Sequence, residues 1–325
     1  AHAKLDLFAQ LVDTDLLADP ELAPLLAAYF PQRLHRRYGA AIVRHPLGRE
    51  ILATLVGNRL LNLMGPTFVA RLQDETGASA PALVRAAGQA ARLYGLPALW
   101  DAIEGLDNAV PGAVQVDMLV ETRRLLERAA LWLLRRPDAA EAARRTGAQV
   151  VDALRAGLED VLPGADREAL DRRHAALTKS GVPESLAAQV AALEPLYGAL
   201  DIGALAHWRV ARAGMVAGVY HALAADLEVP WLRGAIRALP RLHHLHRKAR
   251  SAAREELYAQ LARLTGQVLA RRGADAHARL AAWRQTCDGP LDRYRAVVAE
   301  IRAGKGADLA AITVALGELR TLRRD

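Results

Sequence analysis

The amino-acid sequence predicts an all-α fold, a multi-helix array, and three observations support this. Hydrophobic residues make up 52% of the 325 residues but aromatic residues only 5%, so the core must be built from Ala, Leu and Val. Ala and Leu are strong helix formers, whereas the β-branched residues that favour strands are thin along the chain. Between Pro and Gly residues, apolar side chains recur at the spacing of one helix face.

Pro and Gly residues divide the chain into about fifteen predicted helical segments with short connections. Pro31 and Pro46 stand where a proline can open a helix. Gly65-Pro66 ends the segment 47–64 with a sharp bend. In Thr76-Gly77-Ala78-Ser79 one helix stops and the next begins, with Ser79 as its N-cap.

The sequence also contains a candidate internal repeat. Residues 83–106 match residues 216–239, and Leu96-Pro97 then falls on Val229-Pro230. A duplicated pair of helical subdomains explains these matches, and so does coincidence between Ala/Leu-rich helices; both interpretations stay open. The expected division is N-terminal helices at 1–76, a first repeat at 77–200 and a second repeat at 201–325.

The positive charge of the chain does not by itself indicate a nucleic-acid partner. The net charge is +7, and only four of the 43 basic residues are lysines. Abundant Arg and Ala are typical of a GC-rich genome, and the arginines alternate with Asp and Glu along the chain. A nucleic-acid-binding protein would gather its basic residues on one face. We therefore expect no nucleic-acid partner.

Cysteine content and apolar runs favour a cytoplasmic protein outside the membrane. The single cysteine, Cys287, excludes an internal disulfide and a multi-cysteine metal site. No apolar run reaches the ~18–20 residues that cross a bilayer, so we expect no membrane partner. The chain opens at Ala1-His2-Ala3-Lys4 directly into helical spacing without a leader, so we expect a cut helix and a fragment of a longer protein.

The sequence contains no complete set of residues for an active site. His243 and His246 share one helix face, but two nitrogens without a third ligand make a poor metal site. Gly304-Lys305-Gly306 lacks the Ser or Thr and the preceding strand of a phosphate-binding loop, so we interpret it as a turn that ends a helix. We expect Cys287 to be a half-buried structural thiol. The prediction is therefore no catalytic, cofactor-binding or metal-binding residue in this chain.

The segment from Gly48 to Ser79 is the most informative part of the sequence. Polar residues such as Asn58 stand there among apolar ones and require hydrogen-bond partners. With its Gly-Pro-Thr-Phe and Glu-Thr-Gly-Ala-Ser motifs, this segment resembles the C-terminal region of the large bacterial NAD-specific glutamate dehydrogenases. Further segments share the resemblance, which spans essentially the whole chain: Ala1 to Leu5, Ala28-Tyr29-Phe30-Pro31, Tyr94 to Trp100, Leu106-Asp107-Asn108, Ala192 to Tyr197 and Ala315 to Arg320.

The resemblance implies a parent enzyme that oxidatively deaminates L-glutamate to 2-oxoglutarate with NAD. It places the catalytic lysine and the dinucleotide-binding domain upstream of Ala1, so no catalytic residue is transferred to this chain. Residues 1–76 would then continue from that upstream catalytic region, and the partners would be this region and further copies in a homo-oligomer. The alternative hypothesis is an independent helical binding module that contacts nucleic acid or an acidic protein.

Three residues around the Gly65-Pro66 bend are candidate contacts with the rest of such an enzyme. Asn62, Phe68 and Arg71 stand at positions that a simple apolar stripe does not explain. Phe68 would supply a large apolar contact, while Asn62 and Arg71 would add polar ones. The other interpretation is that the bend only joins two core helices. The sequence leaves both open.

Overall fold

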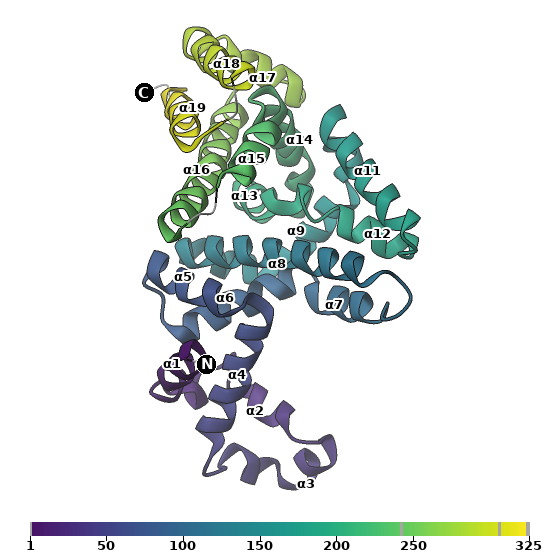
Figure 1. The fold of residues 1–325 in the computed structure, drawn as a ribbon, viewed down its shortest axis with the longest axis vertical. Helices are drawn as coiled ribbons and strands as arrows, with labels where there is room; N and C mark the ends of the chain where they lie inside the picture. Colours follow the sequence, from purple (N-terminus) through teal and green to yellow (C-terminus); the bar gives the residue numbers. More distant parts are fainter. Residues whose placement is uncertain (1, 241–242, 305–306, 323–325) are drawn as a thin grey trace. The chain divides into compact units, whose positions relative to one another are not determined.

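The computed structural model describes residues 2–240, 243–304 and 307–322 (Figure 1). These residues form nineteen α-helices and two short 3-10 helices, with no strand among them. The structure therefore confirms the predicted all-α, multi-helix array.

Most of the helices are short and follow one another with few connecting residues. The helices of the first half are α1 (His2–Val12), η1 (Leu16–Ala18), α2 (Pro24–Tyr29), α3 (Gln32–Val43), α4 (Gly48–Met64), α5 (Pro66–Thr76), α6 (Ala80–Leu93), α7 (Leu96–Glu104), α8 (Gly112–Arg135) and α9 (Pro137–Ala156). Those of the second half are α10 (Leu158–Val161), α11 (Gly164–Lys179), α12 (Glu184–Ala191), η2 (Pro195–Gly198), α13 (Ala199–Leu205), α14 (Val210–Asp226), α15 (Val229–Ala238), α16 (His244–Leu269), α17 (Ala276–Arg284), α18 (Asp288–Ala303) and α19 (Leu309–Thr321).

The chain divides into two compact units. Unit 1 comprises residues 1–148 and 174–197, and unit 2 comprises residues 149–173 and 198–325. Helices α9 and α11 each pass from one unit to the other. The expected segments 1–76, 77–200 and 201–325 divide the chain by its candidate repeats, whereas the two units divide it by compactness. The division by repeats stays a prediction.

Unit 1 is built around the pair α6 and α8. Half of the ten buried residues of α6 are alanines, including Ala86, Ala87 and Ala90. Such small side chains let the axes of two helices approach closely. The buried residues of α8 include larger ones such as Leu125 and Trp132. Helices α5, α7 and α12 also pack on α8, while α1, α2 and η1 pack on α4.

Unit 2 is built around α14, which packs against α10, α13, α15, α16 and α17. Helix α19 closes the other side of α16 and also contacts α18. Tyr294 of α18 is buried, and its hydroxyl donates a hydrogen bond to the Leu227 carbonyl at the end of α14. Burial is the main cause that raises the pKa of Tyr294 above its ordinary value, so this hydroxyl stays protonated as a donor.

The two candidate repeats form similar helix triplets. Helix α6 ends at Leu93 and α14 at Asp226, while α7 begins at Leu96 and α15 at Val229, so both pairs are 133 residues apart. The residue before α7 and the residue before α15 are both left-handed, with φ of 65° at Gly95 and 50° at Glu228. The long helices α8 and α16 follow and pack on both earlier members of their own triplet.

The structure corrects the expected number of segments, because the described residues contain more helices than the predicted fifteen or so. One added break, between α13 and α14, has neither Pro nor Gly at its turn. His207 and Trp208 there adopt positive φ angles of 53° and 55°. The Trp208 ring lies so close to Gly203 that a Cβ at Gly203 would stand 2.5 Å from it. This tertiary contact supports a turn that local sequence does not announce.

Candidate functional site

The bend between α4 and α5 is the centre of the candidate site. Gly65 joins the two helices with φ 75° and ψ 154°, a backbone conformation that only glycine adopts readily. Pro66 then occupies the first position of α5, where its missing N–H costs nothing. The predicted sharp bend at Gly65-Pro66 is therefore confirmed.

A side chain from α8 secures this bend. The Nη2 of Arg123 donates a hydrogen bond to the carbonyl oxygen of Met64, the last residue of α4. A cation suits this position, since carbonyls at the end of a helix lack partners and carry partial negative charge. A Cβ at Gly65 would lie 2.8 Å from the same Nη2, so the glycine also makes room for the guanidinium group.

Ionic and aromatic contacts extend from Arg123 to the start of α5. The Arg123 Nε lies 2.9 Å from Glu127 Oε1, and Arg71 Nη2 lies 3.7 Å from Glu127 Oε2. The Arg71 guanidinium carbon also stands 4.6 Å from the centre of the Phe68 ring. Glu127 thus joins two arginines, and Phe68 lies beneath one of them.

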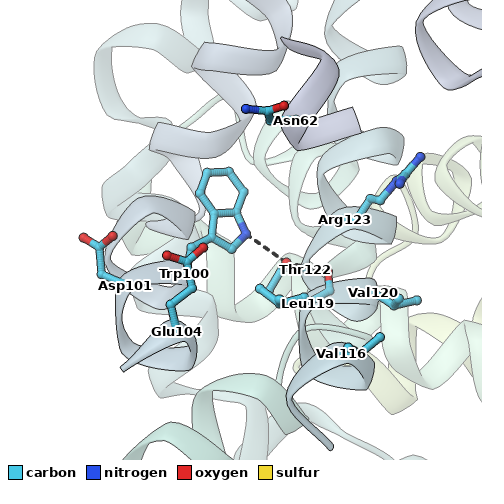
Figure 2. Close-up of a pocket in the computed structure, with 9 residues that line it drawn as sticks. All are labelled: Asn62, Trp100, Asp101, Glu104, Val116, Leu119, Val120, Thr122 and Arg123. Carbon is cyan, nitrogen blue, oxygen red and sulfur yellow. Dashed lines mark hydrogen bonds between the residues drawn. The ribbon is translucent and has the colours of Figure 1, made fainter. Parts of the chain in front are cut away.

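On the other side of Arg123, a cavity of about 420 Å³ opens between α4, α7 and α8 (Figure 2). The Trp100 Nε1 donates to Thr122 Oγ1 at 2.9 Å, and this bond connects the walls formed by α7 and α8. Exposed carboxylates and valines form the rim. The lining residues are Asn62, Trp100, Asp101, Glu104, Val116, Leu119, Val120, Thr122 and Arg123, and we call this cavity the α7–α8 pocket.

The structure places the three predicted contact residues in different surroundings. Asn62 is exposed and lines the α7–α8 pocket. Phe68 is only 5% exposed, so its ring packs inside unit 1, while Arg71 is half-buried above it. Phe68 and Arg71 therefore lie together, whereas Asn62 lines a cavity that neither of them lines. A role of these residues in contacting the rest of a longer protein stays a hypothesis.

Sequence reasoning missed the residues of α8 that hold the bend. Arg123 and Glu127 are recognisable as a helical ion pair four residues apart. The bond from Arg123 to Met64, however, joins residues that are 59 positions apart, and local pattern contains no signal for it. Trp100 stands in a segment that carries the family resemblance, but no local pattern there predicts its hydrogen bond to Thr122.

The other singled-out residues have ordinary structural surroundings. Cys287 is buried rather than half-buried as expected, and burial chiefly raises its pKa to about 11. The rings of His243 and His246 stack with their centres 3.9 Å apart. Across the described part of the chain, no group of three or more His, Cys, Asp or Glu side chains suits a metal ion. Lys305 and Gly306 of the glycine–lysine turn lie outside the described residues.

Among the described residues, none of the helices combines the length and the apolar character that crossing a bilayer requires.

Comparison with known proteins identifies the family. A family model described as "Glutamate dehydrogenase, C-terminal" matches residues 1–321. A protein named NAD-specific glutamate dehydrogenase from Halomonas elongata is 34% identical over 98% of this chain. Proteins of the same name from Pseudomonas aeruginosa and Mycobacterium tuberculosis are 33% and 32% identical over 99% and 100% of it. The chain spans 20% of the length of each of these relatives. The chain therefore belongs to the glutamate dehydrogenase C-terminal family.

Proposed function

We propose that this chain is the non-catalytic C-terminal helical region of an NAD-dependent glutamate dehydrogenase. The parent reaction would convert L-glutamate, NAD and water to 2-oxoglutarate, ammonia and NADH. One observation supports this most directly: the whole chain matches one fifth of the length of proteins that bear this name.

The region would pack on the upstream catalytic region of the same polypeptide and help subunits assemble into a homo-oligomer in the cytoplasm. Its folded surface supports such a role, because large apolar side chains such as Leu34, Val43 and Val116 are exposed at 45%, 63% and 60%. Leu34 and Val43 lie on α3 and Val116 lies on α8, so each of these helices offers exposed apolar area to a partner. Nothing in the comparisons favours the alternative of a nucleic-acid-binding module.

NAD would be held by the upstream region and not by this chain. A dinucleotide domain binds pyrophosphate at a glycine-rich turn between a strand and a helix. The described residues form no strand, and the left-handed glycines Gly65, Gly77, Gly95 and Gly181 all stand next to helix ends in helix-to-helix connections. The residues present do not fit the cofactor, so we assign no step of hydride transfer to them.

Two measurements test this proposal. Calorimetric titration of the purified chain with NAD should give no saturable heat, because the cofactor pocket would lie elsewhere. Removal of residues 1–325 from the full-length protein should impair its assembly or its glutamate-dependent reduction of NAD. Saturable NAD binding by the isolated chain contradicts the proposal, and so does a truncated protein that keeps both assembly and activity.

A further inference from the structure

Helix α3 presents a surface that is both basic and apolar. Every residue from Pro31 to Tyr38 is exposed, and Tyr29, Leu34 and Tyr38 expose 57%, 45% and 47% of their area. Arg33 and Arg37 lie one helical turn apart, with Leu34 beside Arg33. Tyr38 follows at a kink in α3, with φ of −128° and ψ of 24°, so basic and apolar side chains are exposed together along this short stretch. We define the α3 surface as Tyr29, Leu34 and Tyr38 with Arg33, Arg36 and Arg37.

The charge of the α3 surface is uncompensated. No Asp or Glu stands between Glu21 and Glu50, whereas this interval holds five arginines. Within the described ranges, no carboxylate pairs with Arg33, Arg36 or Arg37. A partner surface must therefore be acidic, and it must offer apolar area to Leu34 and Tyr38.

The α7–α8 pocket has this complementary chemistry. Asp101 and Glu104 are exposed on its α7 wall, and no basic side chain among the described residues pairs with them. On its α8 wall, Val116 is 60% exposed and Val120 is 37% exposed. Arg123 also lines the pocket, but its guanidinium group is held by Glu127 and the Met64 carbonyl. The rim therefore combines unpaired negative charge with open apolar surface (Figure 2).

Both surfaces belong to unit 1, and α3 lies apart from α7 within this unit (Figure 1). In this structure the two surfaces do not face each other within one copy of the chain. We propose that the α3 surface of one copy docks on the α7–α8 pocket of a second copy. The inference deepens the proposed role in subunit assembly and rests on it for its place in the parent enzyme.

In this contact Leu34 and Tyr38 pack against Val116 and Val120, while the three arginines face Asp101 and Glu104. The two surfaces differ, so the contact is head-to-tail, and each copy keeps one free surface of each kind. Such a contact closes into a ring or continues as an open chain of copies. Opposite charges across an interface raise the association rate and are screened by salt, so the association weakens as ionic strength rises.

Charge reversal in both directions tests the proposal by sedimentation of the 325-residue chain from micromolar to several hundred micromolar concentration. We expect the unaltered chain to self-associate in low salt. Arg36→Glu/Arg37→Glu should place like charges together and weaken association by roughly tenfold or more. Asp101→Arg/Glu104→Arg should do the same. A mixture of the two double variants should associate again, because opposite charges then face each other at every contact.

Arg247→Glu/Arg272→Glu is the matched control for Arg36→Glu/Arg37→Glu, since it makes the same change of net charge at exposed positions of unit 2. It should leave self-association unchanged. A chain that stays monomeric overturns the proposal, as does a mixture that fails to associate. Loss of RNA or anionic-vesicle binding in the Arg36/Arg37 variant, without self-association of the unaltered chain, assigns the α3 surface to those partners instead. NAD binding by the chain would refute the proposed function while leaving this result intact.

Discussion

At the scale of single residues, Phe68 has the most specific consequence. Its ring is buried beside Arg71, so Phe68→Ala should lower the stability of the isolated chain by about 3–5 kcal/mol, as truncation of a core aromatic does. Thermal unfolding measures this loss as a drop of several degrees. Phe68→Leu keeps most of the apolar volume and should cost much less.

The same experiment separates two interpretations of this residue. A contact with the rest of the enzyme predicts that Phe68→Ala impairs assembly or activity of the full-length protein while the isolated chain keeps its melting temperature. The burial of Phe68 leads us to expect the opposite for the chain, and an unchanged melting temperature would contradict the packing described above.

Substitution of Gly65 tests how much stability depends on its backbone conformation and on the neighbouring Arg123. Gly65→Ala should cost about 3 kcal/mol, because a φ of 75° with a ψ of 154° is open to glycine alone and the added Cβ would push the flexible end of Arg123 away from the Met64 carbonyl. Gly77→Ala is the matched control: φ there is 66°, but nothing lies within 4 Å, so a cost of about 1 kcal/mol is expected. Equal costs in urea unfolding would contradict the extra cost expected at Gly65 from its backbone conformation and the Arg123 contact together.

His221 predicts a pH dependence of stability. This side chain is 6% exposed, and burial, followed by the charge of Arg233, lowers the pKa of His221 from 6.5 to about 4. Between these two pH values the unfolded chain binds a proton that the folded chain does not. His221 therefore contributes stability above pH 6.5 that is lost as the pH falls towards 4, in total about 3 kcal/mol.

Comparison with His221→Phe isolates this contribution from that of the carboxylates. Urea unfolding of both proteins across the range should show a step between pH 4 and 6.5 in the unaltered chain that the variant lacks. Parallel curves would show that His221 titrates alike in the folded and unfolded states.

At the scale of elements, the Trp100–Thr122 hydrogen bond should couple α7 to α8. Trp100→Phe and Thr122→Val each remove one partner of the 2.9 Å bond. A double-mutant cycle in urea should give a coupling free energy of about 0.5–1.5 kcal/mol. Additivity within roughly 0.3 kcal/mol would mean that the bond does not hold the two helices together.

Helix boundaries were predictable where glycine or proline made them. Gly65-Pro66 and Thr76 to Ser79 are breaks in the structure, with Gly77 left-handed at the end of α5 and Ser79 at the N-cap of α6. The Ser79 side chain nevertheless makes no capping hydrogen bond. The turn at His207 and Trp208 was not predictable, because it depends on the packing of a ring against Gly203.

The candidate site was predictable only in part. The Gly65-Pro66 motif predicted the bend, because glycine and proline set the local backbone conformation. The role of Arg123 depends on two segments brought together by the packing of α4 and α5 on α8, which local patterns do not encode. His221 gave no signal beyond a histidine within an apolar helix, and its burial follows from the neighbours of α14.

At the scale of the whole molecule, the candidate duplication is open to a direct test. We expect residues 83–106 to superpose on residues 216–239 in an experimental structure, with α7 crossing α8 as α15 crosses α16. The left-handed residues Gly95 and Glu228 before α7 and α15 support this expectation, since a non-glycine residue rarely adopts this conformation without a structural reason. Unrelated crossings would leave shared Ala/Leu composition as the explanation.

The buried cysteine makes the chain suitable for spectroscopic labelling. Cys287 is the only cysteine, and with a pKa of about 11 roughly one thiol in ten thousand is ionised at neutral pH. Maleimide reagents react with thiolates, so they should react far more slowly with buried Cys287 than with a cysteine introduced at an exposed position. Variants with Leu34→Cys on α3 or Val116→Cys on α8 would each accept one fluorophore at the new cysteine, and Cys287 could stay in place. Energy transfer between two such singly labelled samples would then report how near the two helices come.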